Sequence, residues 1–187
     1  MSALVSGPEA LNLAELLMFC MLLLIAGNET TTNLVSNGAL ALFAHPDEAR
    51  RLRDDPSLIP IAVEEALRYD SPVQNLGRSA TRDVEIQGVT IPKGGRVLPL
   101  YGSANRDPRH YDEADVFRAD RNPTDHMAFG SGIHYCLGAP LARLEARVVA
   151  ETILRRTKKM EISGEPERVI NPIVRGLRRL PVSFQPA

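Results

Sequence analysis

The chain has 187 residues, a length that suits one ordinary domain. Its 22 basic and 23 acidic residues leave a net charge of −1, which gives nucleic-acid binding no electrostatic support. The two cysteines, Cys20 and Cys136, are too few for a disulfide framework, and we expect a cytoplasmic protein without a membrane anchor.

An apolar run over 16–26 predicts a buried helix, and the whole helix is expected over about 9–43. The run is shorter than the about 20 residues that span a membrane. The sequence AGNETT, which ends the run, is poorly suited to a helix interior. Threonine hydroxyls can bond back to carbonyls and widen a helix, which often marks a functional site, and a buried Glu29 needs a partner. A helix kinked only for packing is the alternative.

A second helix is expected over about 58–70, because the residue before Pro72 is disfavoured in the α conformation. Glu65 and Arg68 lie on the same side of this helix at i and i+3. Such a pair is most often an exposed salt bridge that contributes little to stability. Short strands joined by Gly and Pro turns are expected over about 78–101.

The loop over 129–138, with the sequence FGSGIHYCLG, delivers Cys136 to the start of a helix expected over about 137–156. Unpaired amides at a helix start favour a thiolate, so Cys136 is a candidate ligand or nucleophile. A buried structural cysteine is the alternative. A β-hairpin region is expected over about 160–187. The helix after the loop is predicted by an apolar stripe at helical spacing, namely Leu137, Leu141, Leu144 and Val148.

FGSGIHYCLG resembles the haem-binding loop of the cytochrome P-450 family, and every fixed position of that pattern is filled. The resemblance implies that Cys136 is the axial thiolate ligand of haem iron. It further implies that His134 and Arg78 contact haem propionates and that Phe129 packs near the sulfur. The other haem contacts that it implies are Ala26, Gly27, Gly130, Leu137 and Gly138.

Two further motifs resemble the same family. AGNETT is similar to its oxygen-binding groove, which implies that Thr30 acts on the bound oxygen and that Glu29 relays protons to it. Glu65 and Arg68 match the family's Glu-x-x-Arg pair, which forms a buried charge network with an arginine before the haem loop. Arg121 stands where that arginine belongs, and Arg118 is the competing candidate.

The resemblance implies a mainly α fold with small β-sheets (α+β), of which this chain is the C-terminal half. The N-terminal half is expected to be absent, with Met1 an internal methionine of a longer chain. Because the central helix is apolar on every face, we expect a second polypeptide carrying the missing half, or self-association, to cover it. The substrate contacts implied by position are Leu23, Val73, Gln74, Asn75, Ile173 and Val174.

The function implied is a haem-thiolate monooxygenase that uses haem b and O2 on a small apolar organic substrate. The sequence has no flavin or iron–sulfur motif, so electrons are expected from NAD(P)H through a ferredoxin reductase and a ferredoxin that docks on the Arg143 side. One alternative is a truncated or proteolysed fragment without activity that binds haem weakly or not at all. The other is a haem-thiolate sensor or binding protein.

Overall fold

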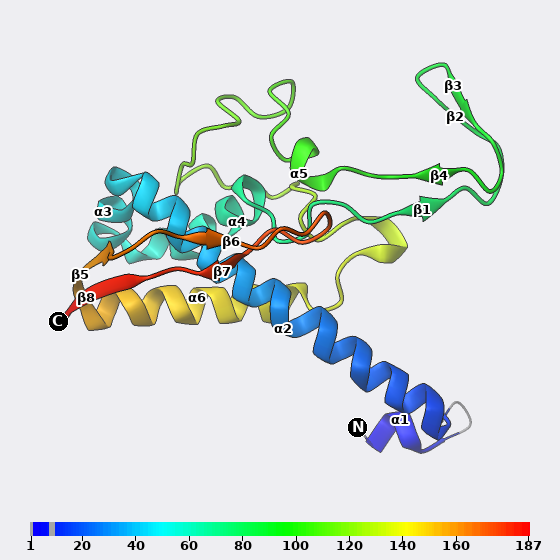
Figure 1. The fold of residues 1–187 in the computed structure, drawn as a ribbon, viewed down its shortest axis with the longest axis horizontal. Coiled ribbons are helices and arrows are strands. Elements are labelled where there is room, and N and C mark those ends of the chain that lie inside the picture. The colour runs from blue at the N-terminus through cyan, green and yellow to red at the C-terminus, as the bar shows by residue number, and fades with distance from the viewer. Residues whose placement is uncertain (1, 8–9) are drawn as a thin grey trace.

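The computed structural model describes residues 2–7 and 10–187, so the interpretation of Met1 lies outside the described residues. The chain is mainly helical with small antiparallel sheets, which confirms the predicted fold class. Four of its helices pack on one another, and the strands over 78–97 extend away from them (Figure 1). The helices are α1 (Ser2–Val5), α2 (Leu13–Ala44), α3 (Pro46–Asp54), the 3-10 turn η1 (Pro56–Leu58), α4 (Ile59–Tyr69), α5 (Tyr101–Ala104), the 3-10 turn η2 (Gly132–His134) and α6 (Ala139–Arg156).

The strands pair in twos in the described part of the chain. In the hairpin of β2 and β3, the turn residues Gln87 and Gly88 both have positive φ, at 49° and 78°, as a tight two-residue hairpin turn requires. The other pairs join segments that lie further apart in the sequence. The pairs are β1 (Arg78–Ser79) with β4 (Arg96–Val97), β2 (Val84–Ile86) with β3 (Val89–Ile91), β5 (Thr157–Ile162) with β8 (Val182–Pro186), and β6 (Glu167–Arg168) with β7 (Leu177–Arg179).

Helix α2 begins with a capping box and then continues without a break. The Asn12 side chain accepts a hydrogen bond from the Glu15 amide, and the Glu15 carboxylate accepts one from the Asn12 amide. Further along, the Thr30 hydroxyl donates to the Ala26 carbonyl at 2.7 Å. The hydroxyl does bond back to the backbone, but the widening expected after Ala26 is absent, because the helix keeps its regular ladder through this turn.

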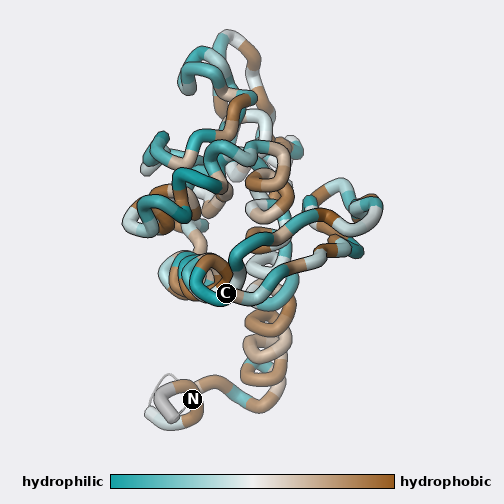
Figure 2. The backbone as a smooth tube through the Cα atoms, turned by 90° about the vertical axis from the view of Figure 1, so that its left-hand side faces the viewer, coloured by the Kyte–Doolittle hydropathy of each residue, from teal (hydrophilic) through white to brown (hydrophobic). Residues whose placement is uncertain are grey.

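The first half of α2 is exposed, so the expectation of a helix buried on nearly all sides is wrong for this half. Leu17 is 62% and Leu24 is 71% exposed. Figure 2 shows this apolar segment leading away from the rest of the molecule. In the second half, Leu34 and Ala41 are buried in the core. The described residues that follow α2 cover only that second half, which leaves the apolar first half without neighbours.

By length and composition alone, α2 is long and apolar enough to cross a membrane, with a mean hydropathy of 1.6 in its most apolar stretch. The run over 16–26 is shorter than a membrane span, but the continuous helix around it is not. Core helices share these properties, so they do not by themselves indicate a membrane.

The core lies where the second half of α2 packs against α3, α4 and α6. Ile59 and Leu67 of α4 are almost completely buried there together with Phe117. The rings of His45 and Tyr69 contact Phe117, with centroids 5.7 and 5.6 Å away. These contacts fix α4, which carries two adjacent glutamates, against α2.

The segment around β6 and β7 returns to α2 through the buried side chain of Asn37. Its amide nitrogen donates to the carbonyls of Asp70 at 3.1 Å and Arg175 at 2.9 Å, and its oxygen accepts from Arg168 at 3.2 Å. The Asp70 carboxylate pairs with Arg168 at 2.8 Å and with Arg175 at 2.6 Å. The C-terminal region is thus tied to the middle of α2 and the end of α4.

Helix α6 buries its small residues rather than its apolar stripe. Ala139 and Ala146 are buried, while the apolar stripe from which the helix is predicted is 49–85% exposed. Spacing predicts a helix from such a stripe but does not say what covers it. The exposed stripe comprises Leu137, Leu141, Leu144 and Val148.

Candidate functional site

Cys136 ends a closed loop just before α6. Its amide donates to the Phe129 carbonyl at 2.9 Å, and its carbonyl accepts from the Ala139 amide at 3.3 Å. Gly130 and Gly132 have φ of +70° and +60°, a backbone conformation that favours glycine. The thiol is free and half-buried. The loop therefore presents one sulfur at a helix N-terminus, where backbone amides favour an anion.

Tyr101 contacts Arg78 and lies beside this loop. An Arg78 nitrogen donates to the Tyr101 hydroxyl at 3.3 Å, and that hydroxyl lies 4.0 Å from where a Cβ on Gly130 would stand. The other hydrogen bonds of Arg78 go to backbone carbonyls, and within the described chain it has no carboxylate partner. His134 is exposed and has no carboxylate partner in that same part of the chain. Both groups are thus available to an acidic ligand.

Glu65, Arg68 and Arg121 are brought together as one buried network. The Glu65 carboxylate accepts two hydrogen bonds from Arg68, at 2.7 and 2.8 Å, and one from Arg121 at 3.2 Å. The side chains of Glu65 and Arg68 are both 0% exposed. This pair is therefore buried and is not the exposed salt bridge that an isolated i,i+3 pair most often forms. Arg118 gives Glu65 only its backbone amide, at 3.0 Å, and its guanidinium faces Glu113 and Asp120.

The same network reaches the residues that precede the Cys136 loop. Arg68 donates to the carbonyls of Asn105 and Ala114, both at 2.8 Å. The Asn105 side chain in turn accepts from the Met127 amide at 2.6 Å and donates to the Ser71 hydroxyl at 2.8 Å. Arg68 thereby fixes the backbone two residues before Phe129.

A second charged cluster lies between α4 and α6. The Glu64 carboxylate accepts from Arg143 at 2.7 and 2.9 Å and contacts the His126 ring at 3.0 Å. Burial alone raises the pKa of Glu64, but the hydrogen bonds from His126 and Arg143 outweigh it and lower that pKa to about 2. The Glu64 carboxylate holds the pKa of Arg143 above its usual range. Arg143 therefore has an internal partner, and its side chain is 34% exposed.

The predicted groove residues lie on α2, in or beside its exposed half. Ala26, Gly27 and Glu29 are exposed, so the expectation of a buried Glu29 is wrong. Glu29 forms no ion pair within the described residues. Thr30 is half-buried and Leu23 is 49% exposed.

The other predicted substrate contacts form one strand-like junction. Val73 and Val174 pair in an antiparallel bridge, and the Gln74 amide donates to the Ile173 carbonyl at 2.8 Å. The Asn75 side chain donates to the Pro172 carbonyl at 2.7 Å. Segments about 100 residues apart thus lie side by side.

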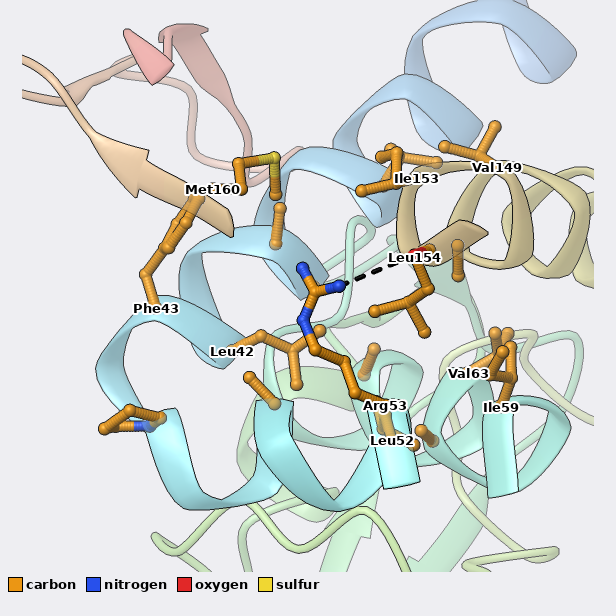
Figure 3. Close-up of a pocket in the computed structure, with 18 of the residues that line it drawn as sticks. Leu42, Phe43, Leu52, Arg53, Ile59, Val63, Val149, Ile153, Leu154 and Met160 are labelled. Carbon is orange, nitrogen blue, oxygen red and sulfur yellow. Dashed lines mark hydrogen bonds between the residues drawn. The ribbon is translucent and has the colours of Figure 1, made fainter. Parts of the chain in front are cut away.

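A large apolar cavity of about 710 Å³ lies elsewhere, among α2, α3, α4, α6 and β5 (Figure 3). Arg53 crosses it and donates to the carbonyls of Leu154 at 3.4 Å and Thr157 at 2.7 Å. Its lining includes Leu42 and Ile153 but none of the predicted site residues. This cavity therefore does not coincide with the predicted site.

The predicted site residues suit a metal held in a cofactor better than a bare metal ion. Among the residues that the structure describes, no group of three or more His, Cys, Asp or Glu could hold a bare ion. A haem needs one axial side chain from this chain, and cations for its propionates. Cys136 would provide the first, and Arg78 and His134, which have no carboxylate partner in the described part of the chain, would provide the second. The residues present therefore fit haem.

Four residues of the site have no counterpart among the sequence predictions. Two adjacent acids in an otherwise apolar helix are a signal for Glu64. His126 and Asn105 carry no local signal, because their partners lie 62 and 37 residues away. Tyr101 likewise contacts Arg78 from 23 residues away.

Comparisons with known proteins agree with these motifs. A family model described as Cytochrome P450 matches residues 2–174. The biotin biosynthesis cytochrome P450 of Bacillus subtilis is 45% identical over 188 residues, which cover 98% of this chain and 47% of that protein. The beta-dihydromenaquinone-9 omega-hydroxylase of Mycobacterium tuberculosis is 45% identical over 172 residues, 92% of this chain and 35% of that protein. The chain thus spans half or less of these curated relatives.

Solved structures show the same partial coverage. The crystal structure of P450BioI in complex with acyl carrier protein ligated to hexadec-9Z-enoic acid superimposes with a TM-score of 0.94 at 45% identity, over 98% of this chain and 48% of that one. CYP109E1 of Bacillus megaterium in complex with corticosterone gives a TM-score of 0.91 at 42% identity, over 98% and 50%.

Proposed function

Because this chain belongs to the cytochrome P450 family, we propose that it carries the haem-binding part of a bacterial haem-thiolate monooxygenase. The observation that supports this most is the closed loop that presents a single free thiol at the start of α6. Two charged clusters anchor that loop and the segment before it to α4. The arrangement suits an anionic axial ligand whose position must be fixed.

When bound, haem b would supply the iron at which O2 is reduced and one oxygen atom is inserted into a substrate. Cys136 would hold the iron as thiolate, and Arg78 and His134 would bind the propionates. The ring would be contacted by Phe129, Gly130, Leu137 and Gly138 from the loop, and by Ala26 and Gly27 from α2.

Thr30 and Glu29 would move protons to the site. The Thr30 hydroxyl proton is held on the Ala26 carbonyl at 2.7 Å, which leaves the oxygen free to accept a hydrogen bond. Rotation of the side chain would release that proton. Glu29 is exposed one residue earlier and can exchange protons with water.

Replacement of Thr30 by Ala tests this role in the haem-loaded protein. We expect a larger share of the consumed electrons to appear as hydrogen peroxide, because proton delivery fails, while the absorption spectrum keeps its thiolate form. Thr32→Ala is the matched control, since that hydroxyl also bonds back to the helix, at 3.0 Å to the Asn28 carbonyl. Equal peroxide yields from the two variants would contradict the role of Thr30.

The substrate is proposed to be a small apolar organic molecule. Its contacts would be Leu23, Val73, Gln74, Asn75, Ile173 and Val174. The compounds in the names and titles of the relatives, a menaquinone, a hexadecenoic acid and corticosterone, are largely apolar. Electrons would come from NAD(P)H through a ferredoxin reductase and a ferredoxin, in the cytoplasm.

A second candidate is a chain that is inactive by itself. The exposed first half of α2 and the exposed stripe of α6 support it, because both are apolar surfaces without neighbours. A second polypeptide that carries the N-terminal half, or a second copy of this chain, would then be needed to complete the site.

The absorption spectrum of the purified chain, reduced under carbon monoxide and with haem quantified, separates these candidates. A Soret band at the position typical of thiolate-ligated haem is expected if this chain builds the site. Absence of haem, or a band typical of a lost thiolate, would support the second candidate. The Cys136→Ser variant is the control, since it removes the thiolate and leaves the loop length unchanged.

A further inference from the structure

Glu64 and Glu65 are neighbours on α4 but serve different parts of the molecule. Successive helix residues point about 100° apart. Glu65 binds Arg68 and Arg121, and through them the segment before the loop. Glu64 instead binds Arg143 of α6 and His126, three residues before Phe129. The two acids therefore anchor two different segments to one helix.

Arg143 also touches the loop itself at two places. One of its nitrogens donates to the Tyr135 hydroxyl at 3.2 Å. Its guanidinium carbon lies 4.6 Å from the centroid of the Phe129 ring. Tyr135 directly precedes Cys136, and Phe129 accepts the hydrogen bond of the Cys136 amide. The guanidinium thus contacts both residues that define where Cys136 lies.

His126 completes the cluster from the other side. Its Nδ1 accepts from the Ala128 amide at 3.2 Å, so the proton is assigned to Nε2, which donates to Glu64. The side chains of His126, Glu64 and Arg143 are 2%, 16% and 34% exposed. Such shielding, together with the two-point contact between Arg143 and Glu64, makes this pair stronger than a surface pair.

We propose that Arg143, with Glu64 and His126, is a positioning cluster that sets where the Cys136 sulfur lies relative to α4 and α6. This inference rests on the proposed function, because it gives the loop its role as the haem-binding loop. It also gives Arg143 a role other than partner docking, since the charge of Arg143 is already matched by Glu64 inside the molecule.

The test uses the full chain in a Cys20→Ser background, so that Cys136 is the remaining thiol. The variants Arg143→Ala and Glu64→Gln remove the pair, and Tyr135→Phe removes one hydroxyl contact on an exposed side chain. Arg147→Ala is the matched control, because that arginine lies one turn further along α6 and pairs with Glu151 on the exposed side. The measurements are the rate of Cys136 alkylation by iodoacetamide and amide hydrogen exchange over 129–138.

We expect Arg143→Ala and Glu64→Gln to raise both rates about tenfold, since a charge-assisted contact that closes the loop is lost. Tyr135→Phe should give a smaller rise in the same direction, and Arg147→Ala none. Rates equal to those of Arg147→Ala in all three variants would overturn the proposal. If Arg143→Ala or Glu64→Gln unfolds, exchange of the α4 amides will show it, and the proposal is then tested by the comparison of Tyr135→Phe with Arg147→Ala.

Haem loading provides an independent spectroscopic readout. In the reduced carbon monoxide complex, Arg143→Ala should increase the share of haem that lacks the thiolate ligand. Arg143→Lys, which keeps the charge, should restore part of the thiolate ligation. If no chain binds haem, the proposed function fails while the loop rates still test the cluster. If haem binds and every variant keeps the spectrum and the loop rates of the unsubstituted chain, the positioning role of the cluster is contradicted while the proposed function stands.

Discussion

Glu65 and Arg68 lie fully inside the protein, where unpaired charges are strongly disfavoured. The Arg68 donors all find acceptors, namely both Glu65 oxygens and the carbonyls of Asn105, Ala114 and Val116. Arg121 and the Arg118 amide complete the shell of Glu65. The network is therefore stable only as a whole, because loss of one member leaves another charge buried without a partner.

Replacement of Glu65 by Ala is expected to lower the free energy of unfolding by about 3–5 kcal/mol, because Arg68 stays buried without its counter-charge. Urea denaturation followed by circular dichroism measures the change. Arg147→Ala, which breaks an exposed pair with Glu151, should change it by less than about 1 kcal/mol. Similar midpoints for the two variants would contradict a structural role for the network.

The second glutamate makes stability depend on pH. The pKa of Glu64 lies at about 2 in the folded chain against an ordinary value of 4.5, so its carboxylate stabilises the fold above pH 4.5. That contribution is lost as pH falls from 4.5 to about 2, because the unfolded chain takes up the proton first. Glu64→Gln should flatten the pH dependence of the unfolding midpoint in this window. An unchanged slope would show that Glu64 is not paired in solution.

Sequence reasoning finds individual residues where the spacing is local. The pair Glu65 and Arg68, three positions apart, and the glycine-flanked Cys136 are visible in the chain. The pairing of Glu64 with Arg143 joins positions 79 residues apart, and no local pattern encodes it. It follows instead from how α4 packs on α6.

Helices follow a similar rule. Apolar spacing predicts α6 over its observed length, but the buried side proves to be alanines and the stripe stays exposed. Composition predicts α2, yet its exposure changes from one half to the other, because exposure depends on what packs against it. The elements could thus be predicted from sequence, while the faces they bury could not.

The start of α2 is stabilised by its own capping box rather than by packing. Asn12→Ala should reduce local helix stability by about 1 kcal/mol and so raise amide exchange in the first turn about fivefold. The global unfolding midpoint should not move, since this half contributes no buried residues. Asn37→Ala is the contrasting variant, because it removes a buried amide and should lower the midpoint. A global effect of Asn12→Ala would show that the first half of α2 is packed in solution.

At the scale of the whole molecule, large apolar surfaces remain exposed. The first half of α2, the stripe of α6 and the lining of the 710 Å³ cavity are all mainly apolar. Isolated chains with such surfaces tend to associate. Figure 1 shows the first half of α2 extending away from the packed helices.

We expect the purified chain to associate in a concentration-dependent manner, which sedimentation velocity measures. Leu17→Glu combined with Leu24→Glu should shift it toward monomer, because both side chains lie on the exposed half of α2. Gln87→Glu, on an exposed hairpin turn, is the control for added charge. A monodisperse monomer with slowly exchanging amides along the first half of α2 would contradict the expectation.

The hydrogen bonds of Asn37 also constrain how the chain is made. Two of its partners, Arg168 and Arg175, are synthesised 131 and 138 residues later. While the ribosome is still adding those residues, α2 cannot reach its final burial without leaving a polar amide unmatched. The middle of α2 is therefore expected to stay hydrated until Arg168 and Arg175 have been synthesised. A ribosome stalled before Arg168 should carry a nascent chain in which this helix is still open to protease.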